Sequence, residues 1–190
     1  MRMARDLRPV SQSQCGLARN VREETMPIKT TQEKYLHELG DIYDAESRFL
    51  KGQQAMLKAA TDATLKAGIE KHIGESEQQI ANLEQVFQLL GEKAKAEPCD
   101  AAKGIVTEGQ KNLKEAGTDE IRDCLIGSSL TKVEHYEIVS YTGLIVGAQA
   151  MGNKEVVALL QQNLKQEEQT AKELEQNAPK LLKQAMQAEV

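Results

Sequence analysis

Apolar residues recur at alternating spacings of three and four from Thr30 onward, a pattern typical of helices with one buried face. Four long segments show it. Thr30 or Thr31 can cap the first segment, Asp62 the second and Thr118 the third. Gly91 ends the second segment, and Gly152-Asn153 forms the turn before the fourth. The first buried stripe is predicted to be Leu36, Leu39, Tyr43, Glu46, Leu50, Gln53 and Leu57.

The order of these segments predicts an all-α four-helix bundle over residues 30–177. Two antiparallel helical hairpins are joined by a long crossover, residues 92–118, that holds a short helix from about 100 to 115. Residues 1–29 are expected to be a disordered N-terminal extension, although a weak transit-like segment or an upstream start codon would also fit. Pro179 is expected to open a short C-terminal helix or tail, residues 178–190.

Composition favours packed helices over sheets. Hydrophobic residues make up 40% of the chain, aromatic residues only 3%, and Trp is absent. The net charge of −5 and the lack of a basic face argue against a nucleic-acid partner. No apolar run is long enough to cross a membrane. The three cysteines form neither a zinc motif nor a disulfide framework, so a reducing, cytoplasmic location is expected, with a homodimer as the commonest closed assembly.

Acidic residues stand where the buried stripes should be apolar. At about 100° per residue, Glu46, Glu137 and Glu167 fall near the centres of their stripes, and Glu134 lies within about 50° of one. His72 lies well inside the stripe of the second segment. Glu75 and Glu77 lie on its two shoulders. His135 is expected to face outward or to lie at an oligomer interface, and His37 is expected to be an ordinary surface residue.

These acids also share one depth. Glu137 lies 15 residues before Gly152, and Glu167 lies 15 residues after it, so both sit about 22 Å from the turn. Glu46 lies 15 residues before Thr61, and Glu75 lies 14 residues after it. Several carboxylates cannot share a dry layer unless cations neutralise them. A site rich in oxygen ligands with an imidazole suits iron or manganese, and zinc less well.

Each signal also has a plain structural interpretation. A single Glu in a stripe is usually an edge residue whose carboxylate reaches water. His72 could be a metal ligand, a neighbour of one, or a hydrogen-bonded core histidine. Tyr43 and Tyr141 lie one turn from Glu46 and Glu137, where they could be core aromatics or could donate hydrogen bonds to the site.

Four segments resemble the ferritin-like stress proteins of the YciE/YciF type in bacteria, a resemblance that covers about residues 30–177: LGDIYDAESRFL (39–50), HIGESEQQI (72–80), KVEHYEIVSY (132–141) and LLQQNLKQEEQTAKEL (159–174). It implies a four-helix bundle with a dinuclear metal centre, similar to rubrerythrins and manganese catalases. The ligands that it implies are Glu46, Glu75, Glu134, Glu137 and Glu167, with His72 at or beside the metal. The chain has no Glu-x-x-His motif, which ferritin-like sites usually carry on two helices, and has His72-x-x-Glu75 instead.

The sequence and the resemblance together predict a stress protein that holds two iron or two manganese ions. We expect it to act on peroxide or dioxygen as a catalase, peroxidase or ferroxidase, with Tyr141 or Tyr43 donating hydrogen bonds near the centre. The rival hypothesis is a non-enzymatic binding or scaffold bundle with structural or vestigial metal. An iron store is a third hypothesis, which would require a closed shell.

Overall fold

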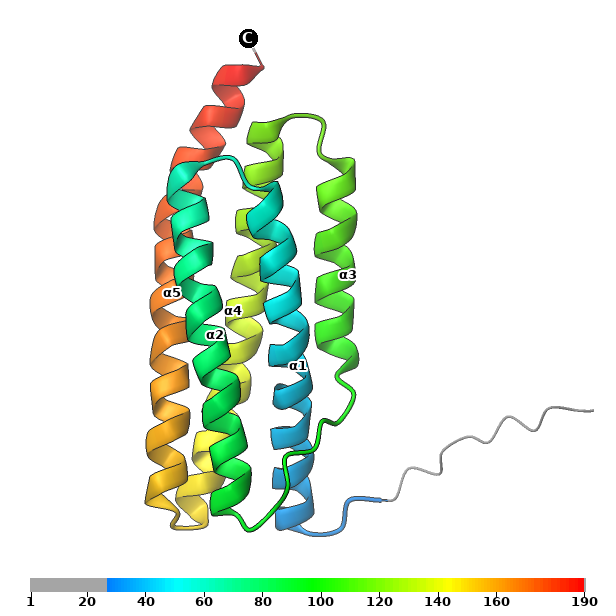
Figure 1. Ribbon diagram of the computed structural model, residues 1–190, viewed down its shortest axis with the longest axis vertical. Helices are drawn as coiled ribbons and strands as arrows, with labels where there is room; N and C mark the ends of the chain where they lie inside the picture. Colours follow the sequence, from blue (N-terminus) through cyan, green and yellow to red (C-terminus); the bar gives the residue numbers. More distant parts are fainter. Residues whose placement is uncertain (1–26, 190) are drawn as a thin grey trace, which may run out of the picture.

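The computed structural model describes residues 27–189, which form five helices and no strand (Figure 1). The helices are α1 (Thr31–Ala59), α2 (Ala63–Leu89), α3 (Asp100–Glu115), α4 (Asp119–Ala150) and α5 (Lys154–Ala188). None of these helices is apolar over enough of its length to cross a bilayer. The predicted all-α class and the four long segments are confirmed. Of the expected disordered extension, residues 1–26 lie outside the described part, and residues 27–29 are non-helical and exposed.

Side-chain caps begin α1, α2 and α4 at the predicted places. Thr30 and Glu33 form a capping box at the start of α1. The carboxylate of Asp62 accepts from the amide of Leu65 at 2.9 Å, and the hydroxyl of Thr118 accepts from that of Ile121 at 3.2 Å. Gly91 and Gly152 follow α2 and α4 with φ angles of 76° and 71°, where residues with a Cβ are strained.

The bundle consists of two antiparallel hairpins, α1–α2 and α4–α5, packed side by side. α1 lies against α4 and α2 lies against α5, so that each bundle helix runs antiparallel to both of its neighbours (Figure 1). The crossover runs back along the whole bundle, and α3 within it packs on the outside of α1 and α4. The architecture is therefore the ferritin-like bundle with one long crossover that the sequence predicted.

The buried face of α1 is rotated from the prediction. Leu39, Glu46 and Gln53 are buried as expected, but Leu36, Tyr43, Leu50 and Leu57 are only half-buried. The face instead includes Tyr35, Ile42, Ala45, Phe49 and Met56. The reason is α3, whose Ile105 and Val106 pack against this side of α1. The spacing of apolar residues within one segment cannot predict that another helix packs on its outer side.

Pro179 does not begin a separate C-terminal piece, so the predicted break there is wrong. It lies inside α5, which continues to Ala188. A proline within a helix removes one backbone hydrogen bond and costs about 3 kcal/mol. Burial of Leu181 in a cluster with Met56 and Ile126 helps offset that cost, as does the ion pair between Lys180 and Asp62 at 2.8 Å.

The core has two apolar parts with a polar layer between them. The larger cluster includes Leu39, Leu83 and Leu144, while the smaller one includes Met56 and Leu130 at the other end. A buried carboxylate also ties the end of the smaller cluster together. Asp123 of α4 accepts hydrogen bonds from the amide and hydroxyl of Thr61 at 2.8 and 2.6 Å, and from the amide of Asp62 at 2.7 Å. The turn between α1 and α2 is thereby fixed to α4.

Candidate metal centre

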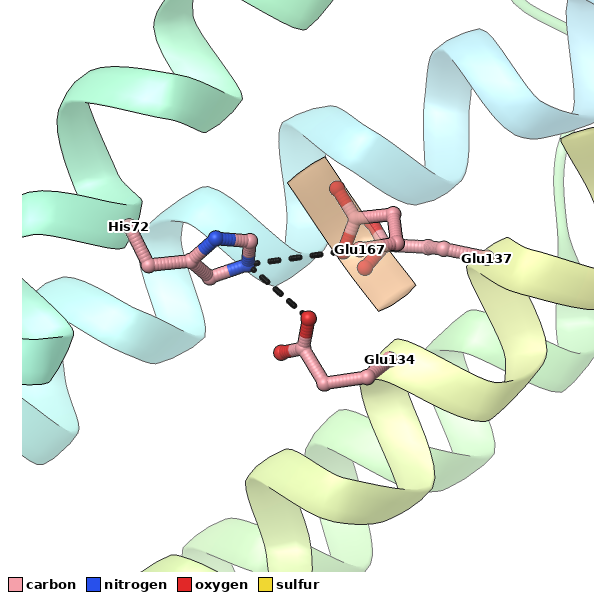
Figure 2. A group of neighbouring side chains, drawn as sticks. All are labelled: His72, Glu134, Glu137 and Glu167. Atoms are coloured by element: carbon pink, nitrogen blue, oxygen red, sulfur yellow. Dashed lines mark ion pairs between the residues drawn. The ribbon is translucent and has the colours of Figure 1, made fainter. Parts of the chain in front are cut away.

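Three helices bring four ionisable side chains to one point in the polar layer. His72 of α2, Glu134 and Glu137 of α4, and Glu167 of α5 each offer one ligand atom, and these atoms all lie within 4.8 Å of one another (Figure 2). The Nε2 of His72 lies 3.3 Å from an oxygen of Glu134 and 3.7 Å from one of Glu167. Glu134 and Glu137 reach the same point because side chains three residues apart share a helix face. All four side chains are buried.

Glu46 of α1 adds a fourth helix to the layer. Its side chain is fully buried, and one of its oxygens accepts a hydrogen bond from the hydroxyl of Tyr141. Glu137 and Glu167 lie together, as expected from their common depth, and Glu46 is joined to the layer through Tyr141.

Glu75 lies one step outside this group. Its carboxylate is half-buried, 3.5 Å from the Nδ1 of His72 and 3.7 Å from the ammonium group of Lys71. The hydroxyl of Thr170 is also 3.3 Å from the Nδ1 of His72. These two neighbours orient the ring so that its Nε2 faces Glu134 and Glu167. Glu75 lies at the edge of the group because it stands on the shoulder of the α2 stripe. Glu77, on the other shoulder, is exposed.

Many polar atoms of the layer have no hydrogen-bond partner. Both oxygens of Glu134 and of Glu137 are unpartnered, as are one oxygen each of Glu46, Glu75 and Glu167 and the Nε2 of His72. An unpartnered buried polar group costs about 1–3 kcal/mol, and more when it is charged. Unpartnered acceptor atoms that converge from three helices are what a bound cation requires.

Burial and mutual repulsion dominate the protonation of the carboxylates. Burial raises the pKa of Glu46 to about 7, even though its bond from Tyr141 and the nearby His72 act in the other direction. Burial and the charges of Glu46 and Glu167 raise the pKa of Glu137 well above its ordinary value. Burial, followed by the neighbouring carboxylate of Glu134, raises the pKa of Glu167 in the same way. The layer therefore resists being fully ionised.

Among residues 27–189, His72 is the one basic side chain that takes part in this layer. Burial alone would lower the pKa of its imidazole, but Glu134, Glu75 and Glu167 outweigh that effect and raise the pKa well above its ordinary value. No Lys or Arg is among the buried residues between 27 and 189. One imidazolium cannot balance the four buried carboxylates, whereas two divalent cations could. An oxygen-rich donor set with one imidazole fits iron or manganese.

Amides and hydroxyls hold the carboxylates from one side. The amide of Gln79 donates to Glu167, and the amide of Asn163 donates to the hydroxyl of Tyr141 at 3.1 Å and to the carbonyl of Gln79 at 3.3 Å. Asn82 donates in turn to Asn163 at 2.7 Å. Sequence reasoning missed Gln79 and Asn82. The signal for Gln79 was available, because spacings of four, three, four and three that start at Leu65 and pass through His72 lead to Gln79, although the next residue, Ile80, is the apolar one.

The structure separates the two predicted tyrosines. Tyr141 is completely buried and donates to Glu46. Tyr43 is not brought to the layer, because it lies on the half-exposed side of α1 and donates to Glu84 at 2.8 Å. His135 is exposed and its Nδ1 lies 2.9 Å from the carbonyl of Thr131, and His37 is also exposed. Both histidines are thus outside the layer, as predicted.

A family model and a protein of known sequence both match most of this chain. A family model described as "Domain of unknown function (DUF892)" matches residues 30–187. The protein YciF of Escherichia coli strain K12 is 30% identical over 146 residues, which make up 76% of this chain and 88% of YciF.

Solved structures share the fold. The structure of the E. coli stress protein YciF matches with a TM-score of 0.78 at 28% identity, over 82% of this chain and 99% of that one. YcfI of Rhodopseudomonas palustris, described as a candidate structural protein, matches with a TM-score of 0.77 at 34% identity, over 80% of this chain and 96% of that one. A protein of Xanthomonas campestris pv. campestris has the same fold, with a TM-score of 0.71 at 24% identity over 84% and 99% of the two chains.

Proposed function

The chain belongs to the DUF892 family, and from that premise we propose that it is a metal-binding stress protein with a carboxylate-rich centre for two iron or two manganese ions. The observation that carries the proposal is the layer of buried carboxylates with unpartnered oxygens on α1, α4 and α5, together with the buried His72 of α2. Glu46, Glu134, Glu137 and Glu167 would hold the ions together with the Nε2 of His72. Iron or manganese, when bound, supplies a one-electron redox couple suited to peroxide or dioxygen.

The residues around these ligands keep the centre in place. Tyr141 fixes Glu46 through its hydroxyl, and Gln79 fixes Glu167 through its amide. Glu75 and Thr170 bracket the Nδ1 of His72 and leave Nε2 for a metal. Such second contacts usually matter nearly as much as the ligands, because they set the orientation of each donor.

A second candidate function is a structural role with metal serving only to stabilise the bundle. The resemblance to YcfI, described as a candidate structural protein, favours it. The chain also lacks the Glu-x-x-His pairs usual in ferritin-like oxidation centres. The two functions share the metal centre and differ only in whether the bound metal catalyses a reaction.

Metal analysis of protein purified without chelators tests the proposal. We expect about two iron or manganese ions per chain in the wild type and a loss of at least one in Glu137→Gln and in Glu167→Gln. Glu168→Gln, which changes the exposed neighbour of Glu167, is the matched control and should keep the wild-type content. Metal-free wild-type protein, or equal metal in all variants, would overturn the proposal.

Peroxide consumption by the same samples separates the two candidate functions. Turnover that is lost with the metal in Glu167→Gln but retained in Glu168→Gln indicates an oxidoreductase. Full metal content without any consumption of peroxide or dioxygen leaves the structural role.

A further inference from the structure

A cavity leads from the surface to the polar layer between α2 and α5. Its volume is about 500 Å³. Its deep end is formed by His72 and Glu134, which are 2% and 0% exposed, so that the cavity opens directly onto the carboxylate cluster. We propose that this cavity binds an uncharged, mainly apolar organic molecule, whose polar end faces His72 and Glu134.

The walls determine the apolar part of the ligand. Leu65 and Ile69 of α2, Leu130 of α4 and Leu174 of α5 line the cavity between its mouth and its deep end. Cavities of about 300–1,000 Å³ with apolar walls and a few convergent polar groups are the usual sites for small organic ligands. Water or peroxide alone would need neither this volume nor these side chains.

The charges at the two ends disfavour an anionic ligand. The carboxylates behind His72 and Glu134 repel an anionic head group, and two divalent ions would leave the layer close to neutral. At the mouth, the ammonium group of Lys71 is already paired with Glu173 at 3.2 Å. A neutral head that can accept or donate one hydrogen bond, such as a hydroxyl or hydroperoxide, matches both ends. The orientation toward a metal rests on the proposed function, but the cavity itself does not.

Gly68 offers a way to fill the cavity without disturbing the bundle. It lines the cavity, and a Cβ built there meets no atom within 4 Å. Gly68→Leu should therefore occupy the cavity while favouring the helix. Gly104 of α3 is the matched control, because its Cβ would also meet open space and it does not line the cavity.

Octan-1-ol and octanoate serve as neutral and charged probes for the metal-free protein, with binding followed by methyl NMR. We expect saturable binding of octan-1-ol with shifts confined to Leu65, Ile69, Leu130 and Leu174, and at least tenfold weaker binding of octanoate. Gly68→Leu should weaken octan-1-ol binding at least tenfold, whereas Gly104→Leu should not. Thermal unfolding verifies that both variants are folded. Unsaturable binding, or equal affinity in the two leucine variants, overturns the proposal.

Manganese loading tests the orientation. Paramagnetic Mn²⁺ should relax the hydroxyl-bearing CH₂ of octan-1-ol more strongly than its terminal CH₃. The reverse order, or equal relaxation, overturns the inferred orientation. Binding of octan-1-ol by a protein that takes up no metal would support the cavity and overturn the proposed function, while metal uptake without octan-1-ol binding would do the opposite.

Discussion

Asp62 shows how one side chain can join two helices. Its carboxylate caps α2 and accepts a hydrogen bond from Lys180 of α5 at 2.8 Å. Burial raises the pKa of this carboxyl, but the hydrogen bonds from Lys180, from the amide of Leu65 and from Gln184 outweigh it and hold the pKa below its ordinary value of 3.8. The ionised form is thus favoured by folding.

Asp62→Ala should lower the free energy of unfolding by about 1–2 kcal/mol at pH 7, as loss of a helix cap does. Because the folded-state pKa is depressed, this contribution is complete above the ordinary value that applies to the unfolded state, and it is lost as the pH falls through the folded-state pKa. Urea unfolding of both proteins from pH 7 to about pH 3 measures the difference. A difference that grows toward low pH would contradict this account, and Glu70→Ala on the exposed side of α2 should show no such trend.

At the scale of elements, Gly147 sets how closely α1 and α4 approach. A Cβ at this position would lie 2.6 Å from the ring of Tyr35, which is itself buried. Gly147→Ala should therefore destabilise the protein by about 1–3 kcal/mol, although alanine favours a helix. Gly143→Ala on the same helix, where a Cβ meets open space, should stabilise it by about 0.5–1 kcal/mol. Chemical denaturation compares the two variants.

Tyr35→Leu combined with Gly147→Ala separates the clash from other causes. The smaller side chain should recover part of the loss, so that the two substitutions together cost less than the sum of their separate effects. Strict additivity would mean that the ring of Tyr35 is not what the alanine meets.

Most helix ends could be predicted from sequence, and the buried faces could be predicted only in part. Thr30, Asp62 and Thr118 mark their helices through local hydrogen bonds that depend on a few neighbouring residues. The face of α1 and the passage of α5 through Pro179 depend instead on partners distant in sequence, Val106 and Ile126 among them. The same distinction applies to the site. Glu46, Glu137 and Glu167 were found because acids in a stripe are conspicuous, whereas Gln79 was missed because Ile80 beside it was the better apolar candidate.

At the scale of the whole molecule, we expect bound metal to raise the stability of the bundle. A ligand present at about 100 times its dissociation constant stabilises the folded state by about 2.7 kcal/mol. For a chain of this size that corresponds to a rise in Tm of about 5–10 °C when Mn²⁺ or Fe²⁺ is added to chelated protein. Scanning calorimetry with and without chelator measures the shift.

Glu137→Gln should reduce that rise, because it replaces one buried carboxylate with an amide that binds metal poorly. The chelated variant should be at least as stable as the chelated wild type, since one fewer charge is crowded into the layer. Glu168→Gln should respond to metal as the wild type does. A Tm unaffected by metal in the wild type would be incompatible with a metal-stabilised bundle.

The position of the polar layer between two apolar clusters has a further consequence for folding. Four helices lined only with leucine and isoleucine could slide past one another by a turn, about 5.4 Å, at little cost. Here such a slip would set the carboxylates of Glu46 or Glu167 against leucines and separate them from Tyr141 and Gln79. The buried carboxylates, whose desolvation destabilises the fold, thus favour the one register of the four helices in which their hydrogen-bond donors are in reach.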